Sequence, residues 1–219
     1  MQKILLFVGG LLTLPLVSRA QAAGSSTRFY VGAGASILTV APFNPQYGGP
    51  TLVGPVLTGG MQFTSRLAAQ VSLGAHWHHD EYSGPGYAAV GGGSSPDVVS
   101  QDVRTTALSL PVLLRYTFTD PAAQLHVDGV VGGTLLHYFY RNEVTVTRSG
   151  QVVSSQQSSF GDTRVNVSLG PALRYDVAPQ LEVVATAPVS YLLNNTVVGK
   201  FNDRLLLNVL VGVHYTFSQ

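Results

Sequence analysis

The chain has 219 residues, enough for one domain or one barrel, and it contains no cysteine, which excludes disulfides, thiolate metal sites and a cysteine nucleophile. Charged residues make up 11% and hydrophobic residues 45%, a composition that fits neither a disordered chain nor a helical membrane protein. The only lysines are Lys3 and Lys200, so we expect no basic patch for nucleic acid.

The first residues, MQKILLFVGGLLTLPLVSRAQAAGSS, predict a cleaved signal peptide over residues 1–22. Lys3 supplies the basic start, residues 4–17 are apolar, and Ala20-Gln21-Ala22 places small residues where a signal peptidase inspects the chain. The apolar run is shorter than the roughly 20 residues that a spanning helix needs. We expect cleavage after Ala22, or alternatively after Ala20, and export of a barrel domain formed by residues 23–219.

Alternation of apolar with polar or small residues runs through the remaining chain and predicts β-strands, while helical periodicity is almost absent. In RFYVGAGASILT, for example, Phe29, Val31 and Ala33 alternate with Tyr30 and Gly32. Four segments alternate clearly and four more weakly, so eight strands are predicted. In chain order they are residues 28–39, 53–63, 67–78, 103–118, 125–140, 163–177, 181–194 and 204–217.

The predicted connections differ in length between the two ends of the strands. The short ones are residues 64–66, 119–124 and 176–180, and the long ones are residues 41–52, 79–102, 141–162 and 195–203. Short turns at one end and long loops at the other are typical of an outer-membrane barrel. Residues 141–162 can also extend the fifth and sixth strands into a hairpin that turns at Arg148-Ser149-Gly150-Gln151.

The apolar side of the strands carries aromatic residues at two levels. Those beside the short turns are Phe29, Phe63, Tyr116, Phe118, Tyr175, Tyr215 and Phe217, and those near the long loops are Trp77, Phe139 and Tyr191. Two aromatic belts around an apolar band indicate a barrel in lipid, whereas a soluble lipocalin-like barrel would carry its apolar residues inside. The predicted fold class is all-β, an eight-stranded antiparallel up-and-down transmembrane β-barrel of the outer membrane, and we expect a monomer.

Four prolines lie inside predicted strands, where each removes a donor from the hydrogen-bond ladder. They are Pro55, Pro111, Pro171 and Pro188. We expect bulges or lost ladder bonds at these positions, and at each of them the assignment of residues to the inside or the outside of the barrel could change.

Two segments resemble those of known outer-membrane proteins. The ending VGVHYTF, with Gly212, Tyr215 and Phe217, is similar to the C-terminal strand signal read by the outer-membrane assembly machinery. Residues 166–183, NVSLGPALRYDVAPQLEV, resemble the strand-turn-strand unit of PorT-like outer-membrane β-barrel proteins. This resemblance implies an eight-stranded barrel with a cleaved signal peptide and no catalytic residues. Roles in that family are mostly unassigned, and one member group is tied to protein secretion.

The inward side of the predicted strands carries alternating basic and acidic residues near the short turns. They are Arg115, Asp128, Arg174, Glu182 and His214. Charges in a narrow lumen are tolerated only when they are paired, so we expect one hydrogen-bonded network that plugs the barrel. Loss of Glu182 is then expected to leave an arginine unpaired and to cost about 3–5 kcal/mol. The alternative is that these residues line a small aqueous channel.

The stretch HWHHDEY, residues 76–82, is the candidate for metal chemistry. His76 and His78 share the lumen-facing side at the outer rim, and His79, Asp80 and Glu81 are expected to begin the long loop. Two imidazoles can hold one metal, but a structural site needs about four ligands and a catalytic site about three. The alternative is a set of polar rim residues in contact with water and lipopolysaccharide, so no cofactor and no metal are predicted.

Three classes of function are open to such a barrel. We expect a non-enzymatic structural or surface-interaction role, such as adhesion, docking or association with secretion, in which the partners are outer-membrane lipid, lipopolysaccharide, the assembly machinery and a surface or secretion protein. A lipid-modifying hydrolase is the first alternative, with His137 near Tyr138, Tyr140, Asn142 and Glu143, although no nucleophile spacing is evident and His137 is expected in the upper aromatic belt. A small-conductance pore is the second.

Overall fold

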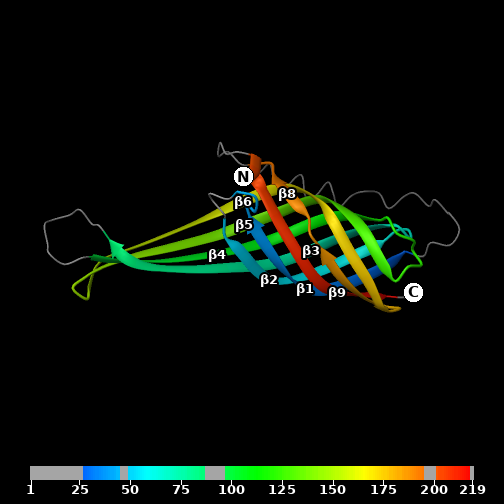
Figure 1. The fold of residues 1–219 in the computed structure, drawn as a ribbon, viewed down its shortest axis with the longest axis horizontal. Helices are drawn as coiled ribbons and strands as arrows, with labels where there is room; N and C mark the ends of the chain where they lie inside the picture. Colours follow the sequence, from blue (N-terminus) through cyan, green and yellow to red (C-terminus); the bar gives the residue numbers. More distant parts are fainter. Residues whose placement is uncertain (1–26, 45–48, 87–96, 195–200, 218–219) are drawn as a thin grey trace, which may run out of the picture.

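The strands of this protein form a closed antiparallel barrel in a computed structural model that describes residues 27–44, 49–86, 97–194 and 201–217 (Figure 1). The strands pair in the order β1-β2-β3-β4-β5-β6-β7-β9, and β1 pairs with β9 to close the barrel. The elements are β1 (Arg28–Val40), β2 (Thr51–Gln62), β3 (Leu67–Gly86), β4 (Asp97–Thr117), β5 (Leu125–Arg148), β6 (Gln151–Ala178), β7 (Leu181–Thr186), β8 (Val189–Leu192), the 3-10 helix η1 (Phe201–Arg204) and β9 (Leu205–Phe217).

The barrel has eight strand positions, because β7 and β8 are two parts of one strand between β6 and β9. Ala172 pairs with Thr186 and Leu169 with Val189, so the register along β6 is the same on both sides of the break. The predicted eight-stranded up-and-down barrel is therefore confirmed. The predicted signal peptide lies outside the described residues, and no helix among those residues is long and apolar enough to cross a membrane.

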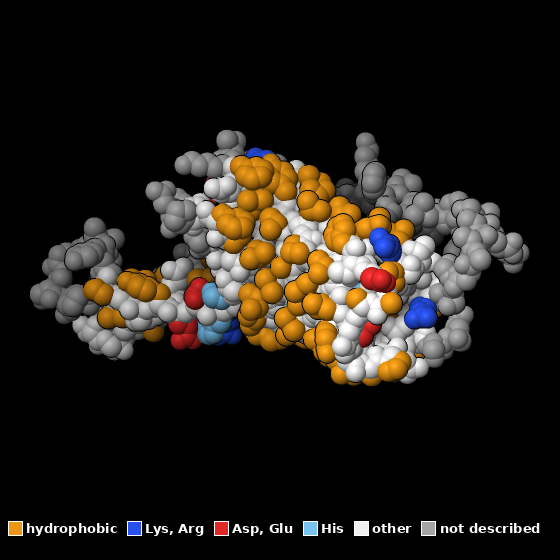
Figure 2. Space-filling model, turned by 45° about the vertical axis from the view of Figure 1, so that its right-hand side comes forward, with side chains coloured by type: hydrophobic (Ala, Val, Ile, Leu, Met, Phe, Trp, Pro, Cys, Tyr) orange, Lys and Arg blue, Asp and Glu red, His pale blue; other side chains and the backbone are white. Residues whose placement is uncertain are grey.

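Side chains alternate between the lumen and the outer wall along each strand, as the sequence pattern predicts. In β1, Phe29 and Val31 are exposed on the outer wall, whereas Tyr30 is buried in the lumen. Apolar side chains cover the wall of the barrel (Figure 2). The aromatic residues Trp77 and Phe139 are half exposed on this wall near the outer end of the barrel. The wall therefore carries the apolar surface that lipid requires.

The four prolines inside the predicted strands leave the register of those strands unchanged. The pairing of β2 with β3 has a gap at Pro55 and that of β3 with β4 has a gap at Pro111, but the register is unchanged beyond each gap. Pro171 pairs with Gly129, and Pro188 lies at the break between β7 and β8. The expected loss of ladder pairs occurs at three of these positions, and the inward and outward sides of the strands do not exchange.

The break at Pro188 requires a residue without a side chain on the neighbouring strand. A Cβ atom at Gly170 would lie 2.6 Å from the Ala187 carbonyl oxygen and 2.5 Å from the Pro188 Cα, and both of these atoms are backbone. We expect Gly170→Ala to lower the free energy of unfolding by about 1–3 kcal/mol, as overpacking does. Gly59→Ala is the control, because a Cβ at Gly59 meets nothing within 4 Å.

Urea titration of refolded protein in lipid vesicles, followed through the fluorescence of the single tryptophan, measures both variants. Gly59→Ala should match or slightly exceed the wild type, since glycine in a strand costs about 0.5–1 kcal/mol relative to alanine. Equal stability of the two variants would show that the backbone at Pro188 can move away.

Four strands continue past the barrel as an arm (Figure 1). We define the arm as residues 79–86, 97–104, 141–148 and 151–162, from β3, β4, β5 and β6. The pairing of β3 with β2 ends at Trp77, but its pairing with β4 continues to Gly86 and Asp97. The prediction of one long loop over residues 79–102 is therefore wrong, since cross-strand pairing extends both strands.

The other half of the arm is the predicted hairpin. β5 and β6 pair as far as Arg148 and Gln151, and the turn between them contains Ser149 and Gly150 at φ values of 49° and 80°. The extension of the fifth and sixth strands and the position of their turn are confirmed.

Candidate functional site: a charged lumen and a protruding arm

Asp128 joins two arginines in the lumen near the short turns. It accepts a hydrogen bond of 2.6 Å from Arg174 Nε and lies 3.7 Å from Arg115 Nε. Arg174 also donates to Glu182 Oε2 at 3.1 Å and to the Thr117 hydroxyl at 3.1 Å. The Asp128 side chain is fully buried and the two arginines are almost fully buried. Four of the five predicted lumen residues thus form one charge-assisted cluster, which we call the lumen network.

His214, the fifth of these residues, contacts the lumen network through an aromatic ring. Its imidazole stacks on Tyr30 with 4.9 Å between ring centroids, and the Arg115 guanidinium lies over the same ring at 5.1 Å. A Cβ atom at Gly60 would overlap the Tyr30 ring, so this glycine leaves the space that the ring occupies. The tyrosine extends the network across the lumen by a cation–π contact.

Above the lumen network the barrel interior contains a polar layer with a small cavity and then an apolar layer. In the middle layer, hydroxyl groups of neighbouring strands pair, as in Thr58 with Ser72 at 2.9 Å and Ser168 with Ser190 at 2.7 Å. A cavity of about 20 Å³ at this level has room for about one water molecule. Beyond it, an apolar layer fills the interior with Leu38, Leu52, Ala107, Leu136, Tyr138 and Leu206. An eight-stranded barrel is just wide enough for such side chains to fill it.

The structure separates His76 and His78, the two histidines considered as a candidate metal pair. His76 is fully buried in the lumen, where its Nε2 contacts the Ser36 hydroxyl. His78 pairs instead with Asp80, with 2.7 Å between Nε2 and Oδ2. The expected rim position of His76 is wrong, because β3 continues outward for ten more residues and places His76 inside the barrel.

The outer face of the arm carries ionisable residues in two rows that cross its strands. His79, Arg104 and Arg141 occupy paired positions on β3, β4 and β5 and form the basic row. Glu81, Asp102 and Glu143 occupy the next outward-facing positions on the same strands and form the acidic row. Figure 2 shows charged side chains gathered where the arm meets the barrel. The basic row lies just beyond Trp77 and Phe139, the residues of the outer aromatic belt.

Asp102 is the most connected residue of the acidic row. It accepts hydrogen bonds from Arg104 Nη2 at 2.8 Å and Arg104 Nε at 3.1 Å, and from His79 Nε2 at 3.1 Å. Hydrogen bonding to the Arg104 guanidinium lowers the pKa of the Asp102 carboxyl. The Arg104 guanidinium thus stabilises the ionised form of Asp102 and fixes its orientation at the base of the arm.

The residues named for a hydrolase do not converge on one site. His137 faces outward, with its Nδ1 2.7 Å from the Thr163 hydroxyl and its ring against Phe139 at 4.5 Å. Tyr138 is buried in the lumen beneath Arg164, whose guanidinium lies 4.5 Å from the ring. The described residues place His137 in the outer aromatic belt, as expected.

The C-terminal residues Gly212, Tyr215 and Phe217 lie in β9, the strand that closes the barrel against β1. Tyr215 and Phe217 pack edge to face on the outer wall with 5.4 Å between ring centroids, and the Tyr215 hydroxyl donates to Gln180 at 2.8 Å. Gly212 pairs with Gly34 of β1. Their use as an assembly signal stays a prediction.

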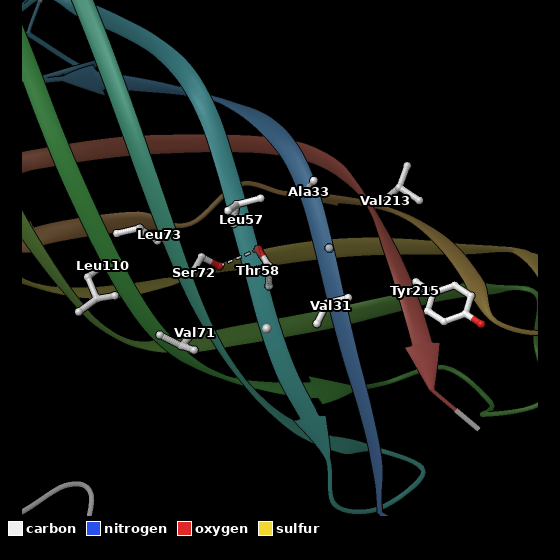
Figure 3. A pocket seen from close by; sticks show the side chains of 12 residues that line it. Val31, Ala33, Leu57, Thr58, Val71, Ser72, Leu73, Leu110, Val213 and Tyr215 are labelled. Carbon is white, nitrogen blue, oxygen red and sulfur yellow. Dashed lines mark hydrogen bonds between the residues drawn. The ribbon is translucent and has the colours of Figure 1, made fainter. Parts of the chain in front are cut away.

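A hollow of about 640 Å³ on the outer wall lies over β1, β2 and β3 (Figure 3). Gly59 leaves it open, and its walls include Val31, Leu57, Val71 and Leu73. These side chains belong to the apolar face that lipid covers, so the hollow offers no aqueous site for a polar substrate.

A closed barrel with an apolar wall, two aromatic levels and a filled lumen defines an integral outer-membrane barrel. The family model for the outer membrane protein beta-barrel domain matches residues 9–217, and the chain belongs to this family. The protein is therefore located in the outer membrane. No curated protein matches the sequence.

Several solved outer-membrane proteins are similar to this chain at low sequence identity. A major outer membrane protein from Thermus thermophilus is 18% identical with a TM-score of 0.50, over 88% of this chain and 100% of that chain. Ail, the attachment invasion locus protein of Yersinia pestis, solved with the heparin analogue sucrose octasulfate, is 11% identical with a TM-score of 0.49, over 88% and 100%. OprG from Pseudomonas aeruginosa is 8% identical with a TM-score of 0.45, over 89% and 97%.

Proposed function

We propose that this protein is a non-enzymatic, plugged barrel whose arm docks an extended segment of another protein at the cell surface. The proposal rests on the edge of the arm formed by residues 151–161 of β6. These residues pair with β5 on one side, whereas β6 pairs with β8 only from Asn166 onward. Among the described strands, none covers the other side of this edge.

The β6 edge has the properties of a site for β-strand addition. An uncovered edge presents backbone N–H and C=O groups that a further strand can pair with. The sequence of the edge, QVVSSQQSSFG, has no charge and no proline, two of the features that protect an edge. A bulge at Val153 interrupts the edge near the turn, and residues 154–161 continue in regular register with β5. All of its residues are exposed. We therefore infer an extended, uncharged polypeptide as the partner.

The opposite edge of the arm lacks these properties. Residues 79–86 of β3 include Asp80, Glu81 and Pro85. Charges and proline discourage pairing with another chain, so one edge of the arm is protected and the other is open. This asymmetry favours a directed docking role over a passive loop.

The lumen supports an anchor better than a pore or an enzyme. The lumen network and the apolar layer fill the interior in series, and His137 faces the membrane side. A closed barrel also leaves no free edge within the membrane, consistent with a monomer. A secretion-associated partner would agree with the PorT-like resemblance. The basic row lies just beyond the outer aromatic belt, where we expect lipopolysaccharide headgroups to contact the barrel.

Photo-crosslinking in the native outer membrane tests this function. A benzophenone amino acid at Gln156 is expected to form an adduct with one polypeptide partner. Ser155→Lys introduces a charge into the β6 edge and should reduce the adduct about tenfold, which corresponds to about 1.4 kcal/mol.

Ser83→Lys is the matched control, since it makes the same change on the β3 edge. The yield of the adduct at Gln156 should be the same with Ser83→Lys as without it. An equal reduction by both substitutions, or no adduct at Gln156 in cells that carry the folded barrel, would contradict docking at the β6 edge.

A further inference from the structure

The acidic row brings three carboxylates together on neighbouring strands of a rigid sheet. Glu81 pairs directly with Asp102, and Asp102 pairs directly with Glu143. Like charges at directly opposite positions of antiparallel strands destabilise a sheet unless a cation lies between them. Arg104 and Arg141 supply part of this compensation, at 2.8 Å from Asp102 and 3.6 Å from Glu143.

Glu81 and Asp102 share a third partner in His79. Its Nε2 lies 3.1 Å from Asp102 Oδ1 and 3.3 Å from Glu81 Oε1. The ligand atoms of all three residues lie within 4.8 Å of one another. Zinc binds imidazole nitrogen and carboxylate oxygen at about 2.0–2.2 Å in tetrahedral geometry, which separates neighbouring ligand atoms by roughly 3.3 Å. The two separations that involve His79 Nε2, 3.1 Å and 3.3 Å, are close to this value.

A hollow beside these residues leaves room for an ion and its water. Its volume is about 420 Å³, and it is lined by Glu81, Asp102 and Glu143 together with Ser83, Ser100 and Thr145. Tyr82 and Gln101 complete the lining, so carboxylates and hydroxyls from three strands make up most of it. The hollow opens to solvent on the outer face of the arm, so an ion can enter without a change in the fold.

We propose that His79, Glu81 and Asp102 form a divalent metal site at the base of the arm, selective for zinc and similar ions. An imidazole ligand favours zinc, nickel or copper over magnesium and calcium, which prefer oxygen ligands alone. Two residues come from β3 and one from β4, so the paired strands hold the ligands in position before the metal binds. Three protein ligands leave a further coordination position for water or for a group of a partner.

Two neighbouring groups shape this site. Arg104 holds Asp102 through two hydrogen bonds and orients its carboxylate, which retains lone pairs for a metal. His79 Nε2 exchanges its contacts with Asp102 and Glu81 for the ion. His78 and Asp80 belong to the opposite face of β3 and form only a two-residue pair.

Calorimetric titration of zinc chloride into tag-free, refolded barrels in detergent near neutral pH tests the site. We expect saturable binding of one zinc ion per barrel, and a loss in affinity of about tenfold or more in His79→Ala and in Glu81→Gln. Millimolar magnesium should not displace the zinc. X-ray absorption of the zinc-loaded protein should show one imidazole ligand that is absent from His79→Ala.

His78→Ala is the matched control, because it removes a neighbouring histidine that lies outside the proposed site, together with its contact with Asp80. It should bind zinc within about twofold of the wild type, a difference of less than about 0.5 kcal/mol. All variants must retain the unboiled gel mobility of the folded barrel. Equal zinc affinity in every variant, an equal loss in His78→Ala, or displacement by magnesium would each overturn the proposal.

Discussion

Asp128→Ala is expected to lower the free energy of unfolding by about 3–5 kcal/mol, since it leaves buried arginines without their carboxylate. Asp128 contacts both Arg115 and Arg174, and its side chain is fully buried. The effect should exceed that of Glu182→Ala, for which the sequence predicted a loss of the same size. Arg174 is not left unpaired in Glu182→Ala, because it keeps its hydrogen bond to Asp128, and the Glu182 side chain is 18% exposed, so water can replace part of its contact. Urea titration in lipid vesicles, followed by tryptophan fluorescence, gives the free energies.

The control for Asp128→Ala removes the charges together. A variant that combines Asp128→Ala with Arg115→Met, Arg174→Met and Glu182→Met removes all four charges of the lumen network. It should recover much of the loss, because apolar side chains replace a buried ion cluster at little cost. A loss of less than about 0.5 kcal/mol in Asp128→Ala would be typical of a surface substitution and would contradict a buried network.

The wild-type barrel is expected to show no steady conductance in planar lipid bilayers. The lumen network and the apolar layer obstruct the interior at two levels, so removing one level should leave the barrel closed. Asp128→Ala/Arg174→Ala should therefore stay closed. Adding Leu52→Ser, Leu136→Ser and Leu206→Ser to this variant should open a small conductance.

These recordings separate a plugged barrel from a pore. The control is the triple variant Leu52→Ser/Leu136→Ser/Leu206→Ser with an intact lumen network. It should also show no steady conductance. A large steady conductance in the wild type, or opening after the loss of the lumen network alone, would contradict closure at two levels.

The arm was the part of the fold that local sequence patterns described least well. Residues 79–102 contain the turn-forming residues Gly84, Pro85, Gly86 and Pro96, which predict a loop. In the structure β3 nevertheless continues to Gly86, because β4 pairs with it from Asp97 onward and satisfies its backbone groups. The length of such a strand depends on its partner strand, and no local pattern in the sequence indicates where the pairing ends.

At the candidate sites, too, the sequence predicted some residues, whereas other contacts follow only from the register of the strands. Arg115, Asp128, Arg174 and Glu182 could be selected from the sequence, because strict alternation assigns them to the lumen. The joint contact of the two arginines with Asp128, the position of Thr117 and the ring contacts of Tyr30 follow from the stagger between strands, which alternation does not encode. His79, Glu81 and Asp102 were missed as a group because the loop prediction removed the register that aligns them.

The sequence by itself determined the class of this protein, an eight-stranded outer-membrane barrel with an apolar wall and a polar lumen, because side chains alternate with period two along every strand. Only the tertiary structure decided which of those side chains meet. It continued β3 and β4 into the arm, buried His76 and brought His79 to Glu81 and Asp102. The physical reason is that strand period is local, whereas register and strand length depend on hydrogen bonds between segments far apart in the chain.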